Sequence, residues 1–309
     1  MSESIIRIRV PATSANLGAG FDTLGMALSL YNVVTIKRFM PPGEFLSVAT
    51  GEGAKELSNW KSNLIIDSYL EACLAWRIKE PKGFEIHSDN AIPLCRGLGS
   101  SASAVVSGVL IAREIYGIEA SESDLLHIMT RIEGHPDNVA PCFLGGMTVG
   151  CWDGNDLRYI RLPSLPADMY VVVAVPDFNV KTTDARKSLP EMVNFSDAVF
   201  NLGRSALMAA AWATGQWDML SWGMDDRLHQ QYRSKLFPGG EVIMDRVRAI
   251  PGCLGVAISG SGPSVLALSL GKPREIAETM CRTFSDHGIK SLFFVLEGNA
   301  VGAKIEVKL

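Results

Sequence analysis

A glycine- and serine-rich segment at residues 93–103 constrains this chain more than any other part of its sequence. It reads Pro-Leu-Cys-Arg-Gly-Leu-Gly-Ser-Ser-Ala-Ser, and its two glycines let the backbone bend and leave room for an approaching ligand. The apolar run that follows, at residues 105–115, predicts a helix. A loop that leads into a helix start directs free N–H groups and the positive end of the helix dipole at one point. The segment therefore predicts a site for nucleotide phosphates, with a plain turn as the alternative interpretation.

The composition excludes several classes of protein. The chain has 309 residues, of which 47% are hydrophobic and 20% are charged, as expected for a globular protein of about two domains. Its net charge of −4 and the absence of a basic patch argue against a nucleic-acid partner. No apolar run is long enough to cross a membrane, and we see no signal-peptide pattern, so we expect a cytoplasmic protein without a membrane partner. The six scattered cysteines include no Cys-x-x-Cys pair, which argues against a zinc site and a disulfide framework.

Strand and helix patterns alternate along the chain without a regular βαβ rhythm, which favours an α+β fold over a doubly wound sheet. Ile6, Ile8 and Val10 alternate with arginines and predict an opening strand with one solvent-facing side. Ser121 and Asp124 have the spacing of a capping box and predict a helix start. Further strands are predicted at 31–39, 84–86, 144–149, 170–175, 253–259 and 265–270, a closing strand pair at 291–296 and 301–309, and helices at 63–76, 121–132, 197–214 and 273–287. Prolines at 163 and 166 indicate the connection to a second half.

The segment at residues 10–25 follows the opening strand and is rich in small residues. The strand's alternation stops here, and the segment contains three glycines together with Asn16 and Asp22. These two side chains could bind a small substrate through polar contacts. A turn-rich connector explains the same residues equally well.

The segment at residues 133–141, Glu-Gly-His-Pro-Asp-Asn-Val-Ala-Pro, concentrates polar groups in a stretch stiffened by two prolines. Glu133 stands at the predicted end of a helix, where the dipole favours cations over carboxylates. That misfit makes Glu133 a candidate ligand for Mg²⁺. His135, taken alone, is more often a structural residue than a catalytic one.

Two arginines in the second half are candidates for binding a carboxylate. Arg186 lies in Thr-Thr-Asp-Ala-Arg at residues 182–186, and Arg233 follows a tyrosine. Two guanidinium groups near each other would form a planar clamp, but the sequence does not show that they meet. A second glycine- and serine-rich turn at residues 259–264 is either a tight hairpin or a wall against the phosphate loop.

Taken together and in this order, the segments resemble the GHMP kinase superfamily over nearly the whole chain. Residues 10–25, 93–103 and 259–264 resemble its three motifs, and residues 133–141 and 182–186 resemble the homoserine kinase branch. The resemblance implies a two-part α+β fold. Residues 1–160 would form an N-terminal, ATP-binding α/β domain of the ribosomal protein S5 domain 2-like type, with a left-handed βαβ crossover. Residues 161–309 would form a C-terminal ferredoxin-like α/β domain.

The resemblance also implies an activity and the residues that carry it. ATP, with Mg²⁺, would phosphorylate the hydroxyl of L-homoserine to give O-phospho-L-homoserine and ADP, in threonine biosynthesis, and the enzyme would be a homodimer. Mg²⁺ would be held by Ser101, with Ser100 as the alternative, and by Glu133. The catalytic residues implied are Asn138, Thr182 and Arg186, and the substrate contacts are Asn16, Asp22, His135, Asn138, Arg186 and Arg233. The ATP contacts implied are Asn63, with the adenine, and Pro93, Leu94, Arg96, Gly97, Leu98, Gly99, Ser100, Ser101, Ala102 and Ser103.

No general base is evident among these residues. The resemblance sets Asn138 opposite the substrate hydroxyl, and an amide cannot take a proton. Asp137 is its neighbour and is expected to point elsewhere. We therefore expect transfer without a dedicated protein base, with the proton passing to phosphate or water.

Three other functions remain open on the sequence alone. A different GHMP kinase would act on a mevalonate-like acid or another alcohol. A dehydrogenase would use Gly97, Gly99 and Ala102 as a dinucleotide fingerprint, although Pro93 just upstream does not suit a central strand. A non-catalytic sensor would keep the fold and bind the ligands only.

Overall fold

A seven-stranded sheet forms the larger part of the molecule. The computed structural model describes residues 5–297 and 300–308, and its first sheet has the strand order β11-β1-β2-β4-β3, with β5 paired to β2 and β6 paired to β5. All neighbours are antiparallel except β3 and β4, which are parallel. The strands are β1 (Ile5–Ala15), β2 (Leu24–Met40), β3 (Phe45–Gly51), β4 (Gly83–Asn90), β5 (Met147–Trp152), β6 (Leu157–Arg161) and β11 (Lys304–Lys308).

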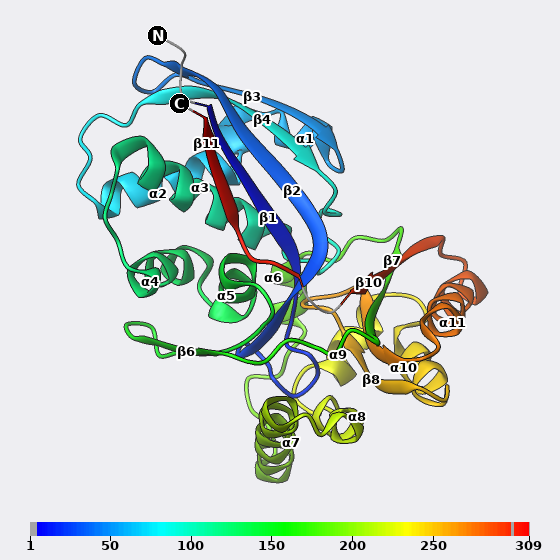
Figure 1. Cartoon of the computed structure of the whole chain (residues 1–309). Helices are drawn as coiled ribbons and strands as arrows, with labels where there is room; N and C mark the ends of the chain where they lie inside the picture. The colour runs from blue at the N-terminus through cyan, green and yellow to red at the C-terminus, as the bar shows by residue number, and fades with distance from the viewer. Residues whose placement is uncertain (1–4, 298–299, 309) are drawn as a thin grey trace.

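Helices cover one face of this sheet and leave the other face bare, as Figure 1 shows. The alternation in β1 explains the choice of face, because Ile6, Ile8 and Val10 are buried while Arg7 and Arg9 are exposed. These inward side chains join one hydrophobic core with the helices. Each fully buried aliphatic side chain contributes about 1.5–3 kcal/mol. The elements on this side are α1 (Ala54–Leu57), η1 (Trp60–Ser62), α2 (Leu64–Ala75), α3 (Ser100–Tyr116), α4 (Glu122–Glu133) and α5 (Pro136–Leu144).

A second, four-stranded antiparallel sheet has the order β10-β7-β9-β8. One of its faces packs on α10 and α11, and its other face shares a core with α7, α8 and residues of β1 and β2. Because this core includes residues from both sheets, such as Leu24 and Val171, the two halves are packed together. The elements are β7 (Met169–Pro176), α6 (Thr182–Lys187), α7 (Phe195–Thr214), η2 (Trp217–Met219), α8 (Leu220–Gly223), α9 (Gln230–Arg233), η3 (Ser234–Leu236), α10 (Gly240–Arg248), β8 (Cys253–Ile258), β9 (Val265–Leu270), α11 (Pro273–Asp286) and β10 (Ser291–Glu297). Among the helices described, none is long and apolar enough to cross a membrane.

The locally signalled elements are confirmed, most with boundaries moved by a few residues, but β2 begins at Leu24, well before the predicted start at residue 31. The capping box of α4 is formed, since the Ser121 hydroxyl accepts from the Asp124 N–H and the Asp124 carboxylate accepts from the Ser121 N–H. The predicted loop at residues 10–25 was too long. β1 continues through a bulge to Ala15, and β2 begins at Leu24, so only residues 16–23 form the loop.

The predicted closing strand pair was wrong. β10 pairs with β7 in the second sheet, whereas β11 crosses back and pairs with β1 in the first. Strands that follow each other in sequence pair only when the rest of the fold leaves both edges free at the same place. Here each strand completes the edge of a different sheet.

The predicted division of the chain into two domains, between residues 160 and 161, stays a prediction.

Candidate functional site

The predicted site residues gather in one cleft of about 700 Å³. It is lined by the β1–β2 loop, the loop before α3, the α4–α5 connection, α6, the end of α9 and the turn after β8. The predicted residues that line it are Asn16, Asp22, Pro93, Leu94, Arg96, Gly97, Leu98, Gly99, Ser100, Ser101, Glu133, His135, Asn138, Thr182, Arg186 and Arg233. Segments far apart in the sequence therefore meet at one place.

The phosphate loop is held from both sides by backbone contacts. Gly97 and Gly99 have φ of +72° and +67°, the left-handed region that favours glycine. The Thr13 N–H of β1 donates to the Leu98 carbonyl at 3.0 Å, and the Ser259 hydroxyl donates to the Gly97 carbonyl at 2.7 Å. α3 starts directly after Gly99, so its first N–H groups have no partner inside the helix. This end of the cleft suits an anion, as the sequence predicts.

Two oxygen ligands meet where α3 and α4 approach each other. The Ser101 hydroxyl donates to Glu133 Oε1 at 2.6 Å. Burial raises the pKa of Glu133, and the hydrogen bond from Ser101 acts in the opposite direction. A hydroxyl and a carboxylate are the hard oxygen ligands that Mg²⁺ takes beside nucleotide phosphates.

Arg186 and Arg233 do come together, and both lie near the ring of Phe21, which was not among the predicted site residues. Arg186 binds both carboxylate oxygens of Asp22, at 2.9 and 3.0 Å. The guanidinium carbons of Arg186 and Arg233 lie 5.8 and 5.1 Å from the centre of the Phe21 ring. Arg233 is only 2% exposed and donates to the Gly260 carbonyl at 2.8 Å. Burial, helped by the neighbouring Arg186, lowers the pKa of Arg233 to about 10, so both arginines stay charged at neutral pH.

The α4–α5 connection and the first turn of α5 supply three polar groups to the middle of the cleft. Asn138 Oδ1 accepts from the Thr13 hydroxyl at 2.8 Å, which fixes the side-chain amide. His135 Nδ1 lies 2.5 Å from Asp137 Oδ1. Burial acts to lower the pKa of His135, but the bond to Asp137 and nearby carboxylates raise it overall. Asp137 lines the cleft but is only 2% exposed and is bonded to His135, so its expected direction away from the substrate hydroxyl stays a prediction.

One group of carboxylates in the cleft has the spacing of a metal site. Ligand atoms of Asp22, His135 and Asp137 all lie within 4.8 Å of one another. However, Arg186 already binds Asp22 and His135 already binds Asp137. These carboxylates are matched by cationic groups of the chain itself, and the Ser101–Glu133 pair remains the better cation site.

Three of the predicted ATP contacts do not line the cleft. Asn63 is buried and caps α2, where its Oδ1 accepts from the Ile65 N–H and its Nδ2 donates to the Leu57 carbonyl. Ala102 and Ser103 are buried in the first turns of α3, and the Ser103 hydroxyl donates to the Ser100 carbonyl. The contact of all three residues with ATP stays a prediction.

A buried network that was not predicted from the sequence positions both arms of the cleft. Asp226 accepts from the backbone N–H groups of His229 and Gln230 at 2.9 and 2.7 Å, just before α9 and Arg233. His229 Nε2 lies 2.8 Å from the Gly18 carbonyl in the loop that carries Asp22. A histidine in a polar stretch gives no sign of burial, so no local signal was available.

Protonation of His229 is expected to destabilise the fold. Nε2 bonds to Gly18, whereas Nδ1 is buried and has no hydrogen-bond partner among the described residues. Burial lowers the pKa of His229; Asp226 and Asp22 oppose this and Arg233 adds to it. The folded state therefore favours neutral imidazole, and its contribution is complete above the unfolded pKa near 6.5. It is lost as the pH falls below about 6.5, by up to about 1.4 kcal/mol per pH unit.

Urea unfolding on either side of the unfolded histidine pKa of about 6.5, for example at about pH 7.5 and about pH 5.5, measures this loss of stability. His229→Gln keeps an N–H donor for Gly18 and removes the titration. The wild-type chain should lose more stability between the two conditions than the variant does. Equal losses in the two chains would contradict the assignment.

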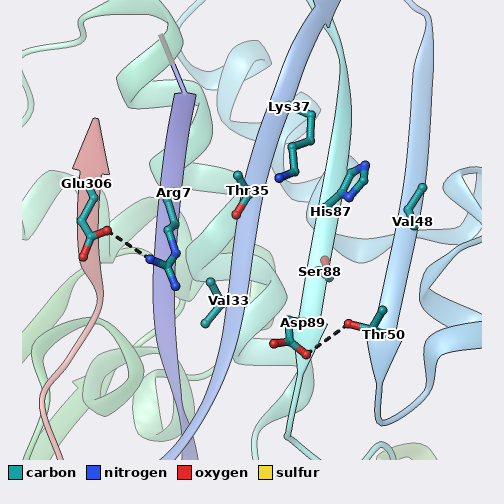
Figure 2. Close-up of a pocket in the computed structure, with 10 residues that line it drawn as sticks. All are labelled: Arg7, Val33, Thr35, Lys37, Val48, Thr50, His87, Ser88, Asp89 and Glu306. Atoms are coloured by element: carbon teal, nitrogen blue, oxygen red, sulfur yellow. Dashed lines mark hydrogen bonds and ion pairs between the residues drawn. The ribbon is translucent and has the colours of Figure 1, made fainter. Parts of the chain in front are cut away.

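A second hollow, of about 480 Å³, lies on the bare face of the first sheet (Figure 2). Two pairs of its polar side chains bond to each other: Arg7 to Glu306 at 3.4 Å, and Thr50, which donates to Asp89 at 3.1 Å. It contains none of the predicted site residues. The cleft between the two halves is therefore the candidate active site.

Known proteins resemble this chain along most of its length. The family model described as "GHMP kinases N terminal domain" matches residues 63–146, and "GHMP kinases C terminal" matches residues 208–286. Homoserine kinase of Carboxydothermus hydrogenoformans is 40% identical over 288 residues, which cover 93% of this chain and 92% of that protein. Homoserine kinase of Desulfitobacterium hafniense is 40% identical over 308 residues, covering 97% and 100%.

Solved structures resemble the fold in the same way. The crystal structure of homoserine kinase from Cytophaga hutchinsonii matches with a TM-score of 0.84 at 30% identity, covering 99% of this chain and 98% of that one. Mevalonate kinase from L. major, in complex with R-mevalonate, matches with a TM-score of 0.69 at 14% identity, covering 95% and 96%. The second likeness is one of fold alone.

Proposed function

The chain belongs to the GHMP kinase family and, within it, to the homoserine kinases, and on this premise we propose that it transfers the γ-phosphoryl group of ATP to the hydroxyl of L-homoserine. The products are O-phospho-L-homoserine and ADP, in threonine biosynthesis. One observation supports this substrate above others. The Asp22–Arg186 pair lies beside Arg233 in the same cleft as the phosphate loop, so a carboxylate, an ammonium group and a phosphate can all be bound within one cavity.

Homoserine fits this recess as a small zwitterion with a hydroxyl. Its carboxylate takes the place of Asp22 on Arg186 and also meets Arg233, and bidentate binding suits both guanidinium groups. Its ammonium group takes the place of Arg186 on Asp22, near the Asn16 side chain, which already accepts from the Asp22 N–H at 3.0 Å. Thr182, at the start of α6, and His135 complete the wall around the substrate.

The residues at the other end of the cleft fit ATP with Mg²⁺. Loop amides from Gly97 onward and the N-terminus of α3 bind the phosphates, and Arg96 lines the same stretch. Ser101 and Glu133 are the oxygen groups that would hold the metal ion. When bound, Mg²⁺ neutralises charge that develops on the phosphate oxygens. Phosphoryl transfer otherwise requires mainly positioning, which the loop and the two arginines provide.

We further propose that no side chain acts as general base. The Thr13 hydroxyl holds Asn138 by its Oδ1. The amide nitrogen makes only a long contact of 3.5 Å to Asp137 Oδ1, so it can bind and orient the substrate hydroxyl. Asp137 is buried, and His135 already occupies its Oδ1. The proton of the hydroxyl passes to phosphate or water.

Asp137→Asn tests this mechanism directly. We expect kcat to fall less than about 10-fold with no new pKa in the pH profile, whereas loss of a general base costs about 10²–10⁴-fold. Asn138→Asp, which supplies a carboxylate at the neighbouring position, should not raise kcat. Complete loss of turnover in Asp137→Asn, with fold and ATP affinity intact, would contradict the proposal. So would a faster Asn138→Asp enzyme with a clear acid-limb pKa.

An ADP-release assay with Mg·ATP tests the function as a whole. L-Homoserine is compared with D-homoserine, L-threonine, mevalonate and galactose. We expect strong turnover with L-homoserine only. Turnover with another alcohol would keep the kinase but overturn the roles of Arg186, Arg233 and Asp22, and ATP binding without turnover would indicate a sensor.

The same proposal includes the enzyme's location, its oligomeric state and its division into domains. We propose that the enzyme acts in the cytoplasm, that it is a homodimer, and that residues 1–160 and 161–309 are its two domains. β11 returns to the first sheet at the end of the second domain, so this division concerns the chain order and not every strand. The domain resembling a ferredoxin-like fold is supported by the antiparallel second sheet backed by α10 and α11.

A further inference from the structure

Phe21, in the β1–β2 loop, lies beside both arginines of the candidate active site. The guanidinium carbon of Arg186, on α6, lies over its ring at 5.8 Å from the centre, and that of Arg233, at the end of α9, lies at 5.1 Å. The ring of the buried His229 is 5.2 Å from the Phe21 ring. A cation within about 6 Å of the centre of an aromatic ring is attracted to the face of that ring. The Phe21 ring therefore acts on both of the arginines that line the cleft.

Core packing does not explain the position of Phe21. The side chain is half-buried and belongs to none of the three hydrophobic cores formed by the described residues. Its own loop holds it in place, because Asn16 Oδ1 accepts from the Asp22 N–H at 3.0 Å and the Thr23 N–H donates to the Gly20 carbonyl at 3.0 Å. Phe21 is also not one of the described residues that line the cleft. An effect of its ring on the substrate must therefore pass through the two guanidinium groups.

Arg233 is a buried cation with few hydrogen-bond partners. Its side chain donates to the Gly260 carbonyl at 2.8 Å, and the same oxygen also accepts from Asn16 Nδ2 at 2.9 Å. Its Nε is buried and has no hydrogen-bond partner within the part of the chain that the structure describes. Burial and the like charge of Arg186 both lower the pKa of Arg233, although nearby carboxylates oppose this shift. A charge in this position needs attraction from a further group, and the Phe21 ring supplies it.

An aromatic ring suits this place because it attracts a cation without occupying the N–H groups of that cation. A carboxylate in the same position would accept hydrogen bonds from the guanidinium groups and would compete with the carboxylate of the substrate. Phe21 leaves the N–H groups of Arg186 and Arg233 available. We propose that Phe21 is a positioning residue, whose ring holds both guanidinium groups in the orientation that binds the substrate carboxylate. This inference rests on the proposed function, which supplies that carboxylate.

Phe21→Leu tests this role, because it keeps an apolar side chain and removes the ring. We expect the KM for L-homoserine to rise on the order of 10-fold, while kcat and the Kd of ATP stay within about 3-fold. A contact that is equally strong in the bound substrate and in the transition state changes KM and not kcat. A fall in kcat or in ATP affinity as large as the rise in KM would show a merely structural role and overturn the proposal.

Phe200→Leu is the matched control. The Phe200 ring, on α7, also lies beside two arginines, with the guanidinium carbons of Arg204 and Arg227 at 4.5 and 4.0 Å from its centre. Phe200 and both of these arginines lie outside the cleft. This variant should leave the KM for L-homoserine unchanged. Equal values of KM in Phe21→Leu and Phe200→Leu would overturn the role of Phe21.

Two further variants show whether the ring acts through the arginines. Phe21→Tyr keeps the aromatic face and should hold KM within about 3-fold of the wild-type value. A KM as high as that of Phe21→Leu would contradict a role for the ring. In the Arg186→Met background, Phe21→Leu should raise KM by a smaller factor than in the wild-type enzyme, because one of the two groups on which the ring acts is absent. Equal factors in the two backgrounds overturn the proposal.

Turnover of the wild-type enzyme separates this inference from the function on which it rests. If the wild-type enzyme does not phosphorylate L-homoserine, the proposed function is overturned and this inference with it. If the wild-type enzyme is active and Phe21→Leu leaves KM unchanged, only the role of Phe21 is overturned.

Discussion

Gly97→Ala is expected to lower kcat/KM for ATP and for L-homoserine by at least about 100-fold. The new Cβ would lie 2.1 Å from the Ser259 backbone oxygen, and the residue would have to adopt a φ of +72°. The Ser259 turn cannot move away easily, because it belongs to the second half of the molecule and is itself hydrogen-bonded to the loop. The loop amides would shift, and a displacement of about 1 Å is enough for a 100-fold loss in rate.

Gly117→Ala is the control that separates the clash from the backbone strain. Gly117 has a φ of +58°, but an added Cβ there meets nothing within 4 Å. It should cost about 1–2 kcal/mol of stability, because an L residue is strained in this conformation, and leave steady-state kinetics unchanged. Thermal unfolding and ADP release measure both quantities. Equal kinetic losses in the two variants would show that the contact with Ser259 does not shape the site.

Arg186→Met is expected to lower kcat/KM for L-homoserine on the order of 100-fold and to leave the Kd of ATP within about 3-fold. Removing one partner of a bidentate ion pair leaves the other charge unpaired, which costs about 2–5 kcal/mol. In this enzyme the guanidinium serves Asp22 in the free cleft and, on our proposal, the substrate carboxylate afterwards. Steady-state kinetics and calorimetry with ATP distinguish the two affinities.

Two further variants show whether the loss is specific to the substrate recess. Arg246→Met removes an arginine that pairs with Asp286 at 2.6 Å between α10 and α11, at comparable exposure, and should change neither affinity. Asp22→Asn combined with Arg186→Met should cost less than the sum of the single losses, because the two side chains act as a pair. Full additivity would indicate that they bind the substrate independently.

Local signals in the sequence predicted the elements and the segments of the site. The capping box of α4, the glycines of the phosphate loop and the alternation of β1 each depend on neighbours within a few residues. Contacts between distant segments gave no such signal. The meeting of Arg186 and Arg233 over Phe21 depends on how the two halves pack, and so do the separate sheets of β10 and β11. The burial of His229 is of the same kind, because its partner Gly18 is 211 residues away.

The pairing of Asp22 with Arg186 has a consequence for how ligands are discriminated. On the proposed binding mode, a zwitterion brings one charge of each sign and exchanges with the pair, so that Asp22 and Arg186 each have a counter-charge before and after binding. A ligand with a single charge pairs with one side chain of the Asp22–Arg186 pair and leaves the other side chain without a partner. Its affinity then suffers twice, once from its own missing contact and once from the orphaned group. Selection for amino acids over simple acids or amines therefore follows from parity of charge, in addition to any fit of shape.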